Sequence, residues 1–495
     1  MTTDRRPAPA GPARRDLRFL IIGAGMSGLL SAIKLKEAGL DDFVIYEKGD
    51  RIGGTWRENT YPGIACDVPS HFYSYSFAPN PEWSQRFAPG AEIQAYFEQV
   101  ARRYGVDSRI RYDATVTHCR FEDGRWKIRL ADGSTDEGDF VIAATGVLHH
   151  PALPDLEGLD SFEGAAFHSA RWDHDVALAG KRVGVVGTGS SAIQIVSALV
   201  DRVAELTLFQ RTAQWITPVE NPPYGEAEKA EFRQRPEAMA EIRAETAHAF
   251  TAGFANVLVD ANSPVMQAIH AGCVANLENS VRDPELRERL RPTYRAACKR
   301  LVMSDGFYEA IQRPNARLVT EGIERVEKSG VRTRDGQLHE LDVLVLATGF
   351  RVGNFVRPME VMGRDGVRLD DVWKHGPFAY TAISVPDFPN FFLLNGPNGP
   401  VGNFSLIEVA ELQFAYILQL VEQVRSGACH DLCASHQAAE RFEAERREAA
   451  KTTIWATGCK SWYIGDDGLP TAWPWTFDRF REEMSQPRLD DFALR

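Results

Sequence analysis

Two glycine-rich loops in this chain have the spacing that binds dinucleotides. The first, Gly23-Ala-Gly25-Met-Ser-Gly28, follows the apolar run 18–22 and precedes a helical pattern over 29–38. In such a strand–loop–helix unit the first glycine makes the tight turn, the second lets the backbone approach a pyrophosphate, and the third lets helix and strand pack closely. The helix N-terminus then faces the phosphates. The loop therefore predicts a site for the pyrophosphate of a dinucleotide.

The second loop repeats this arrangement after the apolar run 182–186. It reads Gly187-Thr-Gly189-Ser190-Ser191 and ends in an alanine, which the third position of the pattern tolerates. We therefore expect a second dinucleotide to place its phosphates on this loop.

The two units differ at the residue that should meet the ribose. Glu47 lies 24 residues past Gly23, directly after an apolar strand, where an acid hydrogen-bonds a ribose diol. Arg211, followed by Thr212, lies 24 residues past Gly187. A carboxylate would repel a 2′-phosphate, whereas a guanidinium can bind it with two hydrogen bonds. The first unit is thus predicted to bind FAD and the second NADPH.

The stretch 162–173 between the two units is unusual for a linker. It carries Phe162, Gly164, His168 and Trp172, whereas a simple connection would be polar. Large aromatics and a histidine among apolar neighbours indicate packing where two domains meet. The alternative is a buried hinge histidine whose two nitrogens are both satisfied.

Two further stretches contain side chains that could take part in chemistry. A second glycine-rich stretch, 53–67, contains Trp56 and ends at Asp67. Lys299 and Arg300 form an isolated basic pair, and such pairs most often lie on a solvated surface.

Taken together, these residues resemble the type I Baeyer–Villiger monooxygenases, flavoenzymes that insert one oxygen atom next to a ketone carbonyl. Stretch 162–173 fits the linker pattern F-x-G-x-x-x-H-x-x-x-W-D of that family. Stretch 53–67 fits its pattern G-G-x-W-x-x-x-x-Y-P-G-x-x-x-D at every defined position. The resemblance covers nearly the whole chain and is weakest over 225–295 and 425–495.

The resemblance implies roles for individual residues. Trp56, Asp67 and Tyr73 would line the flavin, and the adjoining loop residues Gly54 and Thr55 are expected to bind it as well. Lys299 and Trp462 would contact NADP. Arg300 would be the catalytic cation, and Asp67 would hold it through a carboxylate–guanidinium pair.

The resemblance also implies a reaction. NADPH reduces FAD, O₂ adds at flavin C4a, and the C4a-peroxyflavin attacks a ketone to give an ester or lactone. The alternative is a flavin monooxygenase that oxygenates nitrogen or sulfur. Such relatives share both glycine loops but carry a different linker ending. A flavin disulfide reductase would need a redox CxxC, which the sequence lacks. Arg300 and Asp67 argue against a non-catalytic NADP-binding sensor.

The fold predicted from these patterns is α/β, with two Rossmann-like dinucleotide-binding domains. The stretch 139–146, which ends in Ala-Thr-Gly, has a near copy at 342–349, which indicates two related units. Alternation over 112–142 predicts a β-meander, and Ser405 with Glu408 predicts a capping box. We expect a disordered N-terminus over 1–16, an FAD-binding domain over 17–150, a linker over 151–180, an NADP-binding domain over 181–375 with a helical insertion at about 225–297, and a return to the FAD-binding domain with a tail over 376–495.

Composition narrows the class of protein. The chain has 495 residues, 44% of them hydrophobic and 25% charged, which is ordinary for a globular protein of two or three domains. A net charge of −12 argues against nucleic acid or an anionic membrane as a partner. No apolar run spans a bilayer, and no signal-peptide core is seen, so we expect a cytoplasmic enzyme. Seven scattered cysteines without CxxC predict reduced thiols and no metal site.

Overall fold

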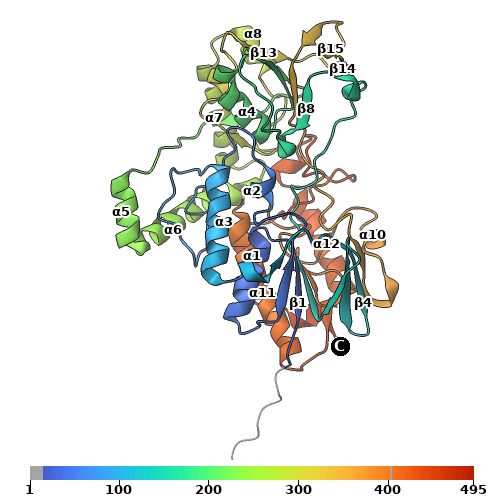
Figure 1. The fold of residues 1–495 in the computed structure, drawn as a ribbon. Helices are drawn as coiled ribbons and strands as arrows, with labels where there is room; N and C mark the ends of the chain where they lie inside the picture. The colour runs from blue at the N-terminus through green and yellow to red at the C-terminus, as the bar shows by residue number, and fades with distance from the viewer. Residues whose placement is uncertain (1–14, 402–403) are drawn as a thin grey trace, which may run out of the picture.

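The computed structural model describes residues 15–401 and 404–495. The chain forms two lobes stacked one above the other, each built on a five-stranded parallel sheet (Figure 1). The predicted α/β architecture with two Rossmann-like units is therefore confirmed. The expected disordered N-terminus lies outside the described residues, except for Arg15 and Asp16.

The first sheet has the strand order β19-β7-β1-β2-β3. Its central strands are apolar throughout and buried on both faces, as a covered parallel sheet requires. Phe19 and Ile21 pack on the helices that cover one face, whereas Leu20 and Ile22 pack on a small antiparallel sheet on the other. The strands are β1 (Phe19–Ile22), β2 (Phe43–Tyr46), β3 (Ile110–Arg111), β7 (Phe140–Ala143) and β19 (Phe391–Leu393), and the covering helices are α1 (Met26–Glu37), α3 (Gly90–Tyr104) and α11 (Leu406–Arg425).

The second sheet repeats this plan with the order β13-β10-β9-β17-β8. In both sheets the strand before the glycine loop is central, between the strand that ends in Ala-Thr-Gly and the next strand along the chain. The repeat read from the sequence is thus a repeat of structure. The elements are β8 (Ala165–His168), β9 (Arg182–Val186), β10 (Glu205–Phe209), β13 (Ala316–Val319), β17 (Val343–Leu346), α4 (Ser190–Leu199) and α9 (Phe307–Ala310).

Each unit also carries an antiparallel meander. The predicted one forms β4 (Val116–Glu122), β5 (Arg125–Leu130) and β6 (Thr135–Gly138). Its counterpart, which the sequence analysis did not identify, forms β14 (Ile323–Glu327), β15 (Gly330–Thr333) and β16 (Leu338–Glu340). Strand β18 (Glu360–Met362) pairs with β4, so the chain rejoins the first unit upstream of residue 376.

Two chain segments cross between the lobes and run side by side. Ala152 donates its N–H to the carbonyl of Gly349 at 2.9 Å, and Arg351 donates to that of His150 at 2.9 Å. We call this pair of segments, residues 150–152 and 349–351, the crossover. The linker stretch is not a free connection either, because its residues 165–168 form β8, the edge strand of the second sheet.

The insertion at 225–297 is helical, as predicted, and it reaches both lobes. The chain leaves the second unit by a loop before α5, and helix α6 lies against the first unit (Figure 1). Arg243 of α6 donates to the carbonyls of His71, Phe72 and Ser74 at 3.2, 3.1 and 2.6 Å. The helices are α5 (Glu226–Gln234), α6 (Pro236–Gly253), α7 (Pro264–Ser280) and α8 (Pro284–Arg289).

The remaining elements are short or belong to the tail. They are α2 (Thr55–Glu58), α10 (Leu369–Val372), α12 (His436–Ala450), α13 (Phe477–Ser485), β11 (Ile216–Thr217), β12 (Val302–Met303), β20 (Leu432–Ala434) and β21 (Phe492–Leu494).

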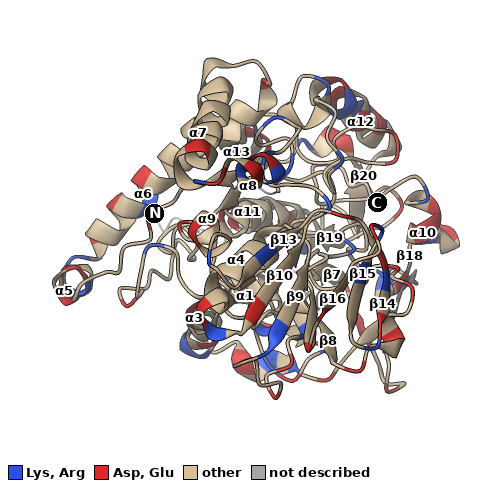
Figure 2. Cartoon of the chain, turned by 90° about the horizontal axis from the view of Figure 1, so that it is seen from above, with Lys and Arg blue, Asp and Glu red and all other residues tan. Residues whose placement is uncertain are grey.

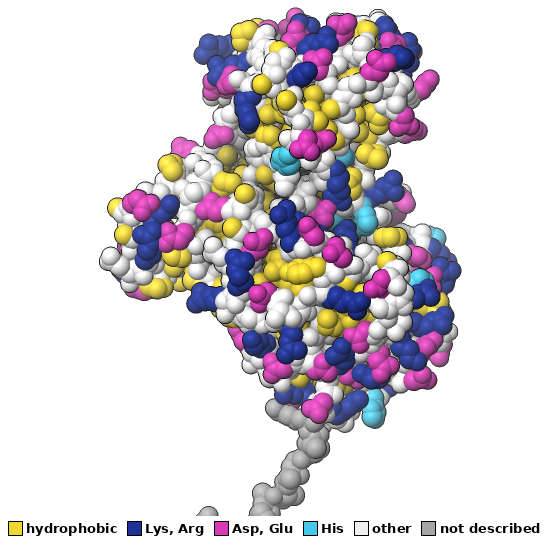
Figure 3. Space-filling model, in the orientation of Figure 1, with side chains coloured by type: hydrophobic (Ala, Val, Ile, Leu, Met, Phe, Trp, Pro, Cys, Tyr) yellow, Lys and Arg dark blue, Asp and Glu magenta, His cyan; other side chains and the backbone are white. Residues whose placement is uncertain are grey.

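Charged residues lie mainly on the helices and loops around the sheets (Figure 2), and both signs are interspersed over the face shown in Figure 3. Within 15–401 and 404–495, no helix is long and apolar enough to cross a membrane.

The predicted capping box is wrong, although α11 begins where expected. The hydroxyl of Ser405 donates to the carbonyl of Phe72 at 3.2 Å and caps no N–H of its own helix. The carboxylate of Glu408 pairs instead with Arg481 at 2.8 Å. Tertiary partners have replaced the local ones, and the first turn of α11 keeps its N–H groups free of a side-chain cap.

The prediction that all cysteines are reduced is also wrong. Cys298 and Cys459 form a disulfide across 161 residues, with their Cα atoms 6.1 Å apart, and the other five cysteines are buried thiols. Spacing along the sequence could detect only a local pair such as CxxC, whereas this pair is brought together by the fold.

Candidate active site

Both glycine loops make the same contact in their units. Gly23 has a φ of +104°, and a Cβ there would lie 2.6 Å from the carbonyl oxygen of Ala144. Gly187 has a φ of +124°, and a Cβ there would lie 2.3 Å from that of Ala347. In each case the crowding carbonyl belongs to the Ala-Thr-Gly end of the neighbouring strand. The glycine loop and the Ala-Thr-Gly end therefore pack directly against each other in both units.

A cavity in the first unit gathers most of the residues predicted to bind the flavin cofactor. Gly28 and Asp67 are not among them. Gly28 packs helix α1 onto the loop, and a Cβ there would lie 1.8 Å from the oxygen of Gly23. Several lining residues were not predicted, among them His149 and Asn395. The predicted residues that line the cavity are Gly23, Gly25, Glu47, Gly54, Thr55, Trp56 and Tyr73.

Glu47 is only 4% exposed and lies at the end of β2. One carboxylate oxygen accepts the N–H of Ala24 at 2.8 Å. The other accepts the N–H of Gly49 at 2.8 Å and pairs with Arg57 at 2.9 Å. A carboxylate offers about four lone-pair sites. One site on the Ala24 side thus remains for a ribose hydroxyl.

Other groups in this cavity also match a flavin dinucleotide. Gly25 and Gly54 face each other so closely that a Cβ on Gly54 would lie 3.3 Å from the Cα of Gly25. Helix α1 begins there without a side-chain cap, so its first N–H groups can bind phosphate. Asn395 Oδ1 is buried without a partner among the described residues, and His149 Nε2 lacks a well-formed hydrogen bond. Buried polar atoms without a partner are rare, and a bound ligand would satisfy them. The cavity therefore fits FAD.

Trp56 and Tyr73 form an edge-to-face pair on one wall of this cavity. The indole Nε1–H donates to the tyrosine hydroxyl at 3.2 Å, and the ring centroids are 5.7 Å apart. Burial raises the pKa of Tyr73, so its hydroxyl stays neutral at physiological pH. This wall thus presents fixed, uncharged rings.

Arg300 and Asp67, predicted as the catalytic pair, do meet. Arg300 Nη2 donates to Asp67 Oδ2, and the backbone of the arginine is held by Gln214, whose side-chain amide donates to the Arg300 carbonyl at 2.8 Å. Burial opposes the charge on Arg300. The carboxylate of Asp67 and then the hydroxyl of Tyr463 more than offset this, so the pKa of the guanidinium lies above its ordinary value.

Tyr463 was missed by the sequence analysis. It is 2% exposed, and its ring packs on that of Trp462 with centroids 4.0 Å apart. Trp462, predicted to contact NADP, is 39% exposed. The tail therefore brings one residue to the arginine and presents its neighbour at the surface.

The loop residues 187–191 and the pair Arg211 and Thr212, predicted to bind NADP, follow the carboxyl ends of β9 and β10. Thr188 Oγ1 donates to the carbonyl of Thr212 at 2.8 Å, which ties the glycine loop to the residue after Arg211. Helix α4 begins at Ser190, after Gly189, and has no side-chain cap. This helix start can bind phosphate in the same way as that of α1.

Lys299 interacts electrostatically with Arg211 at this site. Burial, and then the charge of Arg211, lower the pKa of Lys299. The ammonium also lies 4.6 Å from the ring centroid of Tyr294. The positive charge of Arg211 disfavours the charged form of Lys299, and an anion bound near both would relieve that repulsion. The arrangement suits a phosphate.

The predicted second-unit loop also holds the two lobes together. Ser191 donates to the hydroxyl of Tyr61 at 3.1 Å, and that hydroxyl donates to Gln194 at 2.8 Å. Gln194 in turn donates to the carbonyl of Ala65 at 3.1 Å. Tyr61 belongs to the Tyr-Pro-Gly step of the matched pattern. Its docking on α4 is a role that the pattern alone did not reveal.

The linker residues lie at the edge of the second sheet. Gly164 is required by close approach, because a Cβ there would lie 2.4 Å from the carbonyl of Asp342. Phe162 and Trp172 pack into two apolar clusters of the second unit. The linker motif is thus built into that unit.

His168 ends β8 and is 4% exposed. Its Nδ1 accepts the N–H of Ala170 at 3.1 Å, so the neutral ring carries its proton on Nε2. Nε2 faces the backbone of Gly349 in the crossover but lacks a well-formed hydrogen bond. Burial lowers the pKa of His168, so the ring is neutral near pH 7. The expectation that it lies at the junction of the two units agrees with this position.

The fold and the site together define an oxidoreductase with one site for a flavin dinucleotide and a second site for a nicotinamide dinucleotide. A family model described as pyridine nucleotide-disulphide oxidoreductase matches residues 20–252. An uncharacterized monooxygenase of Mycobacterium tuberculosis is 48% identical over 96% of this chain and 95% of its own. A Baeyer-Villiger monooxygenase of Streptomyces coelicolor is 38% identical over 97% of this chain and 92% of its own.

Solved structures agree with these relatives. The crystal structure of OTEMO in complex with FAD and NADP superposes with a TM-score of 0.87 at 27% identity, covering 98% of this chain and 100% of that one. The chain belongs to the family of FAD- and NADPH-dependent Baeyer–Villiger monooxygenases.

Proposed function

We propose that this enzyme converts a ketone to an ester or lactone and that Arg300, held by Asp67, is its catalytic cation. The net reaction consumes one ketone, one O₂, one NADPH and one proton, and it yields the ester, NADP⁺ and water. The observation that carries the assignment is the ion pair between Arg300 and Asp67, which holds a permanent cation at a fixed, partly buried position.

The chemistry requires such a cation because negative charge appears on oxygen during the reaction. Bound FAD supplies the transfer of electrons from NADPH to oxygen. Arg300 would stabilise the charge that develops on the oxygens of the reacting ketone, since a preorganised donor in a water-poor site needs no reorganisation. Asp67 would orient the guanidinium and keep it charged.

The cofactors are assigned to the two units on the same grounds. FAD would lie in the cavity with its ribose on Glu47 and its ring against Trp56 and Tyr73. NADPH would place its 2′-phosphate between Arg211 and Lys299, with Thr212 and the loop at 187–191 nearby. Trp462 would cover the nicotinamide dinucleotide from the tail.

Substitution of Arg300 tests this proposal. In Arg300→Ala, NADPH should still reduce FAD, but ester formation should fall on the order of 10²–10³-fold, the usual loss for one charged stabiliser. Stopped-flow reduction and ester yield from a panel of cyclic and aryl ketones are measured separately.

Arg317→Ala, which removes an exposed arginine of β13, is the control. Ester formation by Arg300→Ala at the wild-type rate would remove Arg300 from the mechanism. Oxidation of sulfides with no ester from any ketone would instead favour oxygenation of nitrogen and sulfur.

The location of the enzyme is part of the proposal. Because NADPH is a cofactor of the cell interior, its use supports a cytoplasmic enzyme, although the Cys298–Cys459 disulfide would then have to persist in a reducing compartment. Fractionation of the producing cells tests this, and recovery of the protein outside the cytoplasmic fraction would contradict it.

A further inference from the structure

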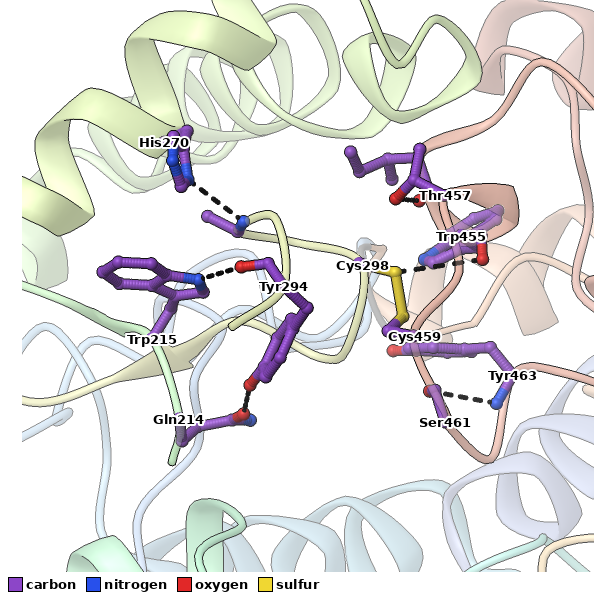
Figure 4. Close-up of a disulfide and its surroundings, with 12 residues drawn as sticks. Gln214, Trp215, His270, Tyr294, Cys298, Trp455, Thr457, Cys459, Ser461 and Tyr463 are labelled. Atoms are coloured by element: carbon purple, nitrogen blue, oxygen red, sulfur yellow. Dashed lines mark hydrogen bonds between the residues drawn. A yellow bond between two sulfur atoms is a disulfide. The ribbon is translucent and has the colours of Figure 1, made fainter. Parts of the chain in front are cut away.

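The disulfide between Cys298 and Cys459 joins two segments that both reach Arg300. The first, residues 294–303, carries Arg300 and is called here the arginine segment. The second, residues 454–464, is called the tail segment. Figure 4 shows the disulfide as the bridge between them. Cys298 lies two residues before Arg300, and Cys459 four residues before Tyr463.

The arginine segment is anchored to the second unit on its other side. Trp215 donates its indole N–H to the carbonyl of Tyr294 at 2.6 Å (Figure 4), and Gln214 donates to that of Arg300 at 2.8 Å. Strand β12, which follows Arg300, pairs with β11. The backbone of the arginine is therefore already fixed, and what remains to be positioned is its long side chain.

The tail segment supplies a group for that side chain. Tyr463 is buried, and its hydroxyl lies beside the Arg300 guanidinium, where it acts together with Asp67 to raise the pKa of the arginine. The carbonyl of Tyr463 accepts the N–H of Thr471 at 2.7 Å, and its ring packs on Trp455 with centroids 5.5 Å apart. Asp67 and Tyr463 thus reach one guanidinium from different parts of the chain.

Hydrogen bonding alone is a weak reason for the tail segment to stay in place. Thr457, Gly458, Lys460 and Trp462 are exposed, so much of the segment lies at the surface. Trp455 and Tyr463 pack in one apolar cluster with Cys298, but ordering the exposed residues between them still costs conformational entropy that this packing has to offset. Cys298, by contrast, is fully buried, and the disulfide ties the exposed segment to it covalently.

We propose that Tyr463 is a positioning residue for Arg300 and that the disulfide holds Tyr463 in place. This inference rests on the role of Arg300 proposed above. Tyr463 narrows the orientations of the guanidinium, so that the cation is aligned when charge develops on oxygen. A misplacement of about 1 Å in such a group can cost on the order of 10²-fold in rate. Reduction of flavin by NADPH does not need that alignment and is left unaffected.

The disulfide itself is tested by counting thiols in the purified, denatured protein. We expect five thiols before reduction and seven after it, since two of the seven cysteines are bonded. Seven thiols before reduction would overturn the part of the inference that concerns the disulfide.

The positioning role is tested on FAD-loaded Tyr463→Phe and Cys459→Ser. In both, ester formed per NADPH consumed should fall roughly tenfold, the value of one hydrogen bond to a charged group. The rate at which NADPH reduces FAD should stay at the wild-type value. A structural defect would instead lower FAD content and both rates together. Tyr104→Phe and Cys429→Ser are matched controls. Tyr104 loses one hydrogen bond, to the Phe77 carbonyl, and Cys429 is a buried free thiol.

Reduction of the folded wild-type enzyme gives a second measurement that needs no variant. A dithiol supplies two electrons and two protons, so that the disulfide becomes two thiols and the reagent a cyclic disulfide. Wild type treated in this way should behave as Cys459→Ser, and Cys459→Ser should not respond.

The two proposals fail in different ways. If Arg300→Ala forms ester normally, the proposed function is wrong. If Arg300→Ala is inactive while Tyr463→Phe and the reduced enzyme keep wild-type coupling, only the inference about the tail is overturned.

Discussion

Asp67 and Arg300 lie 233 positions apart in the sequence and form one ion pair. Asp67 comes from the stretch that follows the first glycine unit, and Arg300 from the segment that follows the helical insertion. The pair therefore forms only when the two lobes are in contact. Docking of Tyr61 on α4, six residues before Asp67 in the chain, holds the same stretch against the second unit. Assembly of the proposed catalytic cation and closure of the lobes are thus one event.

Replacement of Asp67 by asparagine removes the negative charge of the ion pair but keeps a side chain of nearly the same shape. Asn can still accept a hydrogen bond from the guanidinium, but it no longer holds the cation electrostatically. We expect ester formation to fall on the order of 10²-fold, as for a slightly misplaced catalytic group, with reduction by NADPH preserved. Product yield measures ester formation, and stopped-flow absorbance measures the reduction of FAD by NADPH. Asp160→Asn, at an exposed position of the linker, serves as the control. A variant with wild-type ester yield would show that the carboxylate is dispensable.

Arg211 should decide between NADPH and NADH. The residue is exposed at the end of β10, where the first unit has Glu47. Arg211→Ala should weaken binding of NADPH by about 1.5–3 kcal/mol, the value of a hydrogen bond to a charged group, and leave NADH unchanged. Michaelis constants for both coenzymes check this, with Arg202→Ala, also exposed in the second unit, as the control. Equal efficiency of the wild type with both coenzymes would contradict the assignment.

Lys299 should make NADPH binding depend on pH. Its pKa is lowered by burial and by Arg211, so it loses its charge at a lower pH than an ordinary lysine. The charged form binds the phosphate, and affinity is therefore lost as pH rises through that lowered pKa. The Michaelis constant for NADPH should rise with alkaline pH in the wild type. It should stay flat in Lys299→Arg, whose guanidinium remains charged. A flat profile with NADPH in the wild type, or an equal rise with NADH, would exclude this role.

The parts of the site that are local in sequence were predictable. The glycine loops and the ribose residues Glu47 and Arg211 follow from strand–loop–helix spacing, because that spacing alone determines where the phosphates and riboses lie. The pair of Asp67 with Arg300 could be named only through resemblance to a family, since no spacing rule connects residues so far apart.

What could not be predicted arises where distant segments meet. Tyr463, the Cys298–Cys459 disulfide and the docking of Tyr61 each join segments whose own sequences show no partner. The capping box failed for the same reason, because Phe72 offered Ser405 a tertiary acceptor that competed with the local one. Local sequence patterns are enough to predict the two units, whereas the contacts that join the units depend on the folded structure.

The two possible roles of the linker, a local structural one and a coupling of the two lobes, depend on different nitrogens of His168. Its Nδ1 accepts the N–H of Ala170, which is a local structural contact, whereas Nε2 faces Gly349 in the crossover. Asparagine places an acceptor near the Nδ1 position and removes Nε2. Glutamine extends to the Nε2 position and removes the local acceptor. His168→Asn and His168→Gln therefore test the two nitrogens one at a time.

If His168 couples NADP binding to the arrangement of the lobes, losing Nε2 should weaken that coupling by about 0.5–2 kcal/mol, the range for residues that link two sites without touching either ligand. His168→Ala and His168→Asn should then turn over more slowly and release more hydrogen peroxide per NADPH, while FAD content and thermal stability stay near wild type. His168→Gln should retain the wild-type yield of ester. Peroxide and ester are quantified side by side with the flavin absorbance. Loss of FAD or of folding in His168→Ala, rescued by His168→Asn, would instead identify a structural histidine whose function is to cap the turn at Ala170.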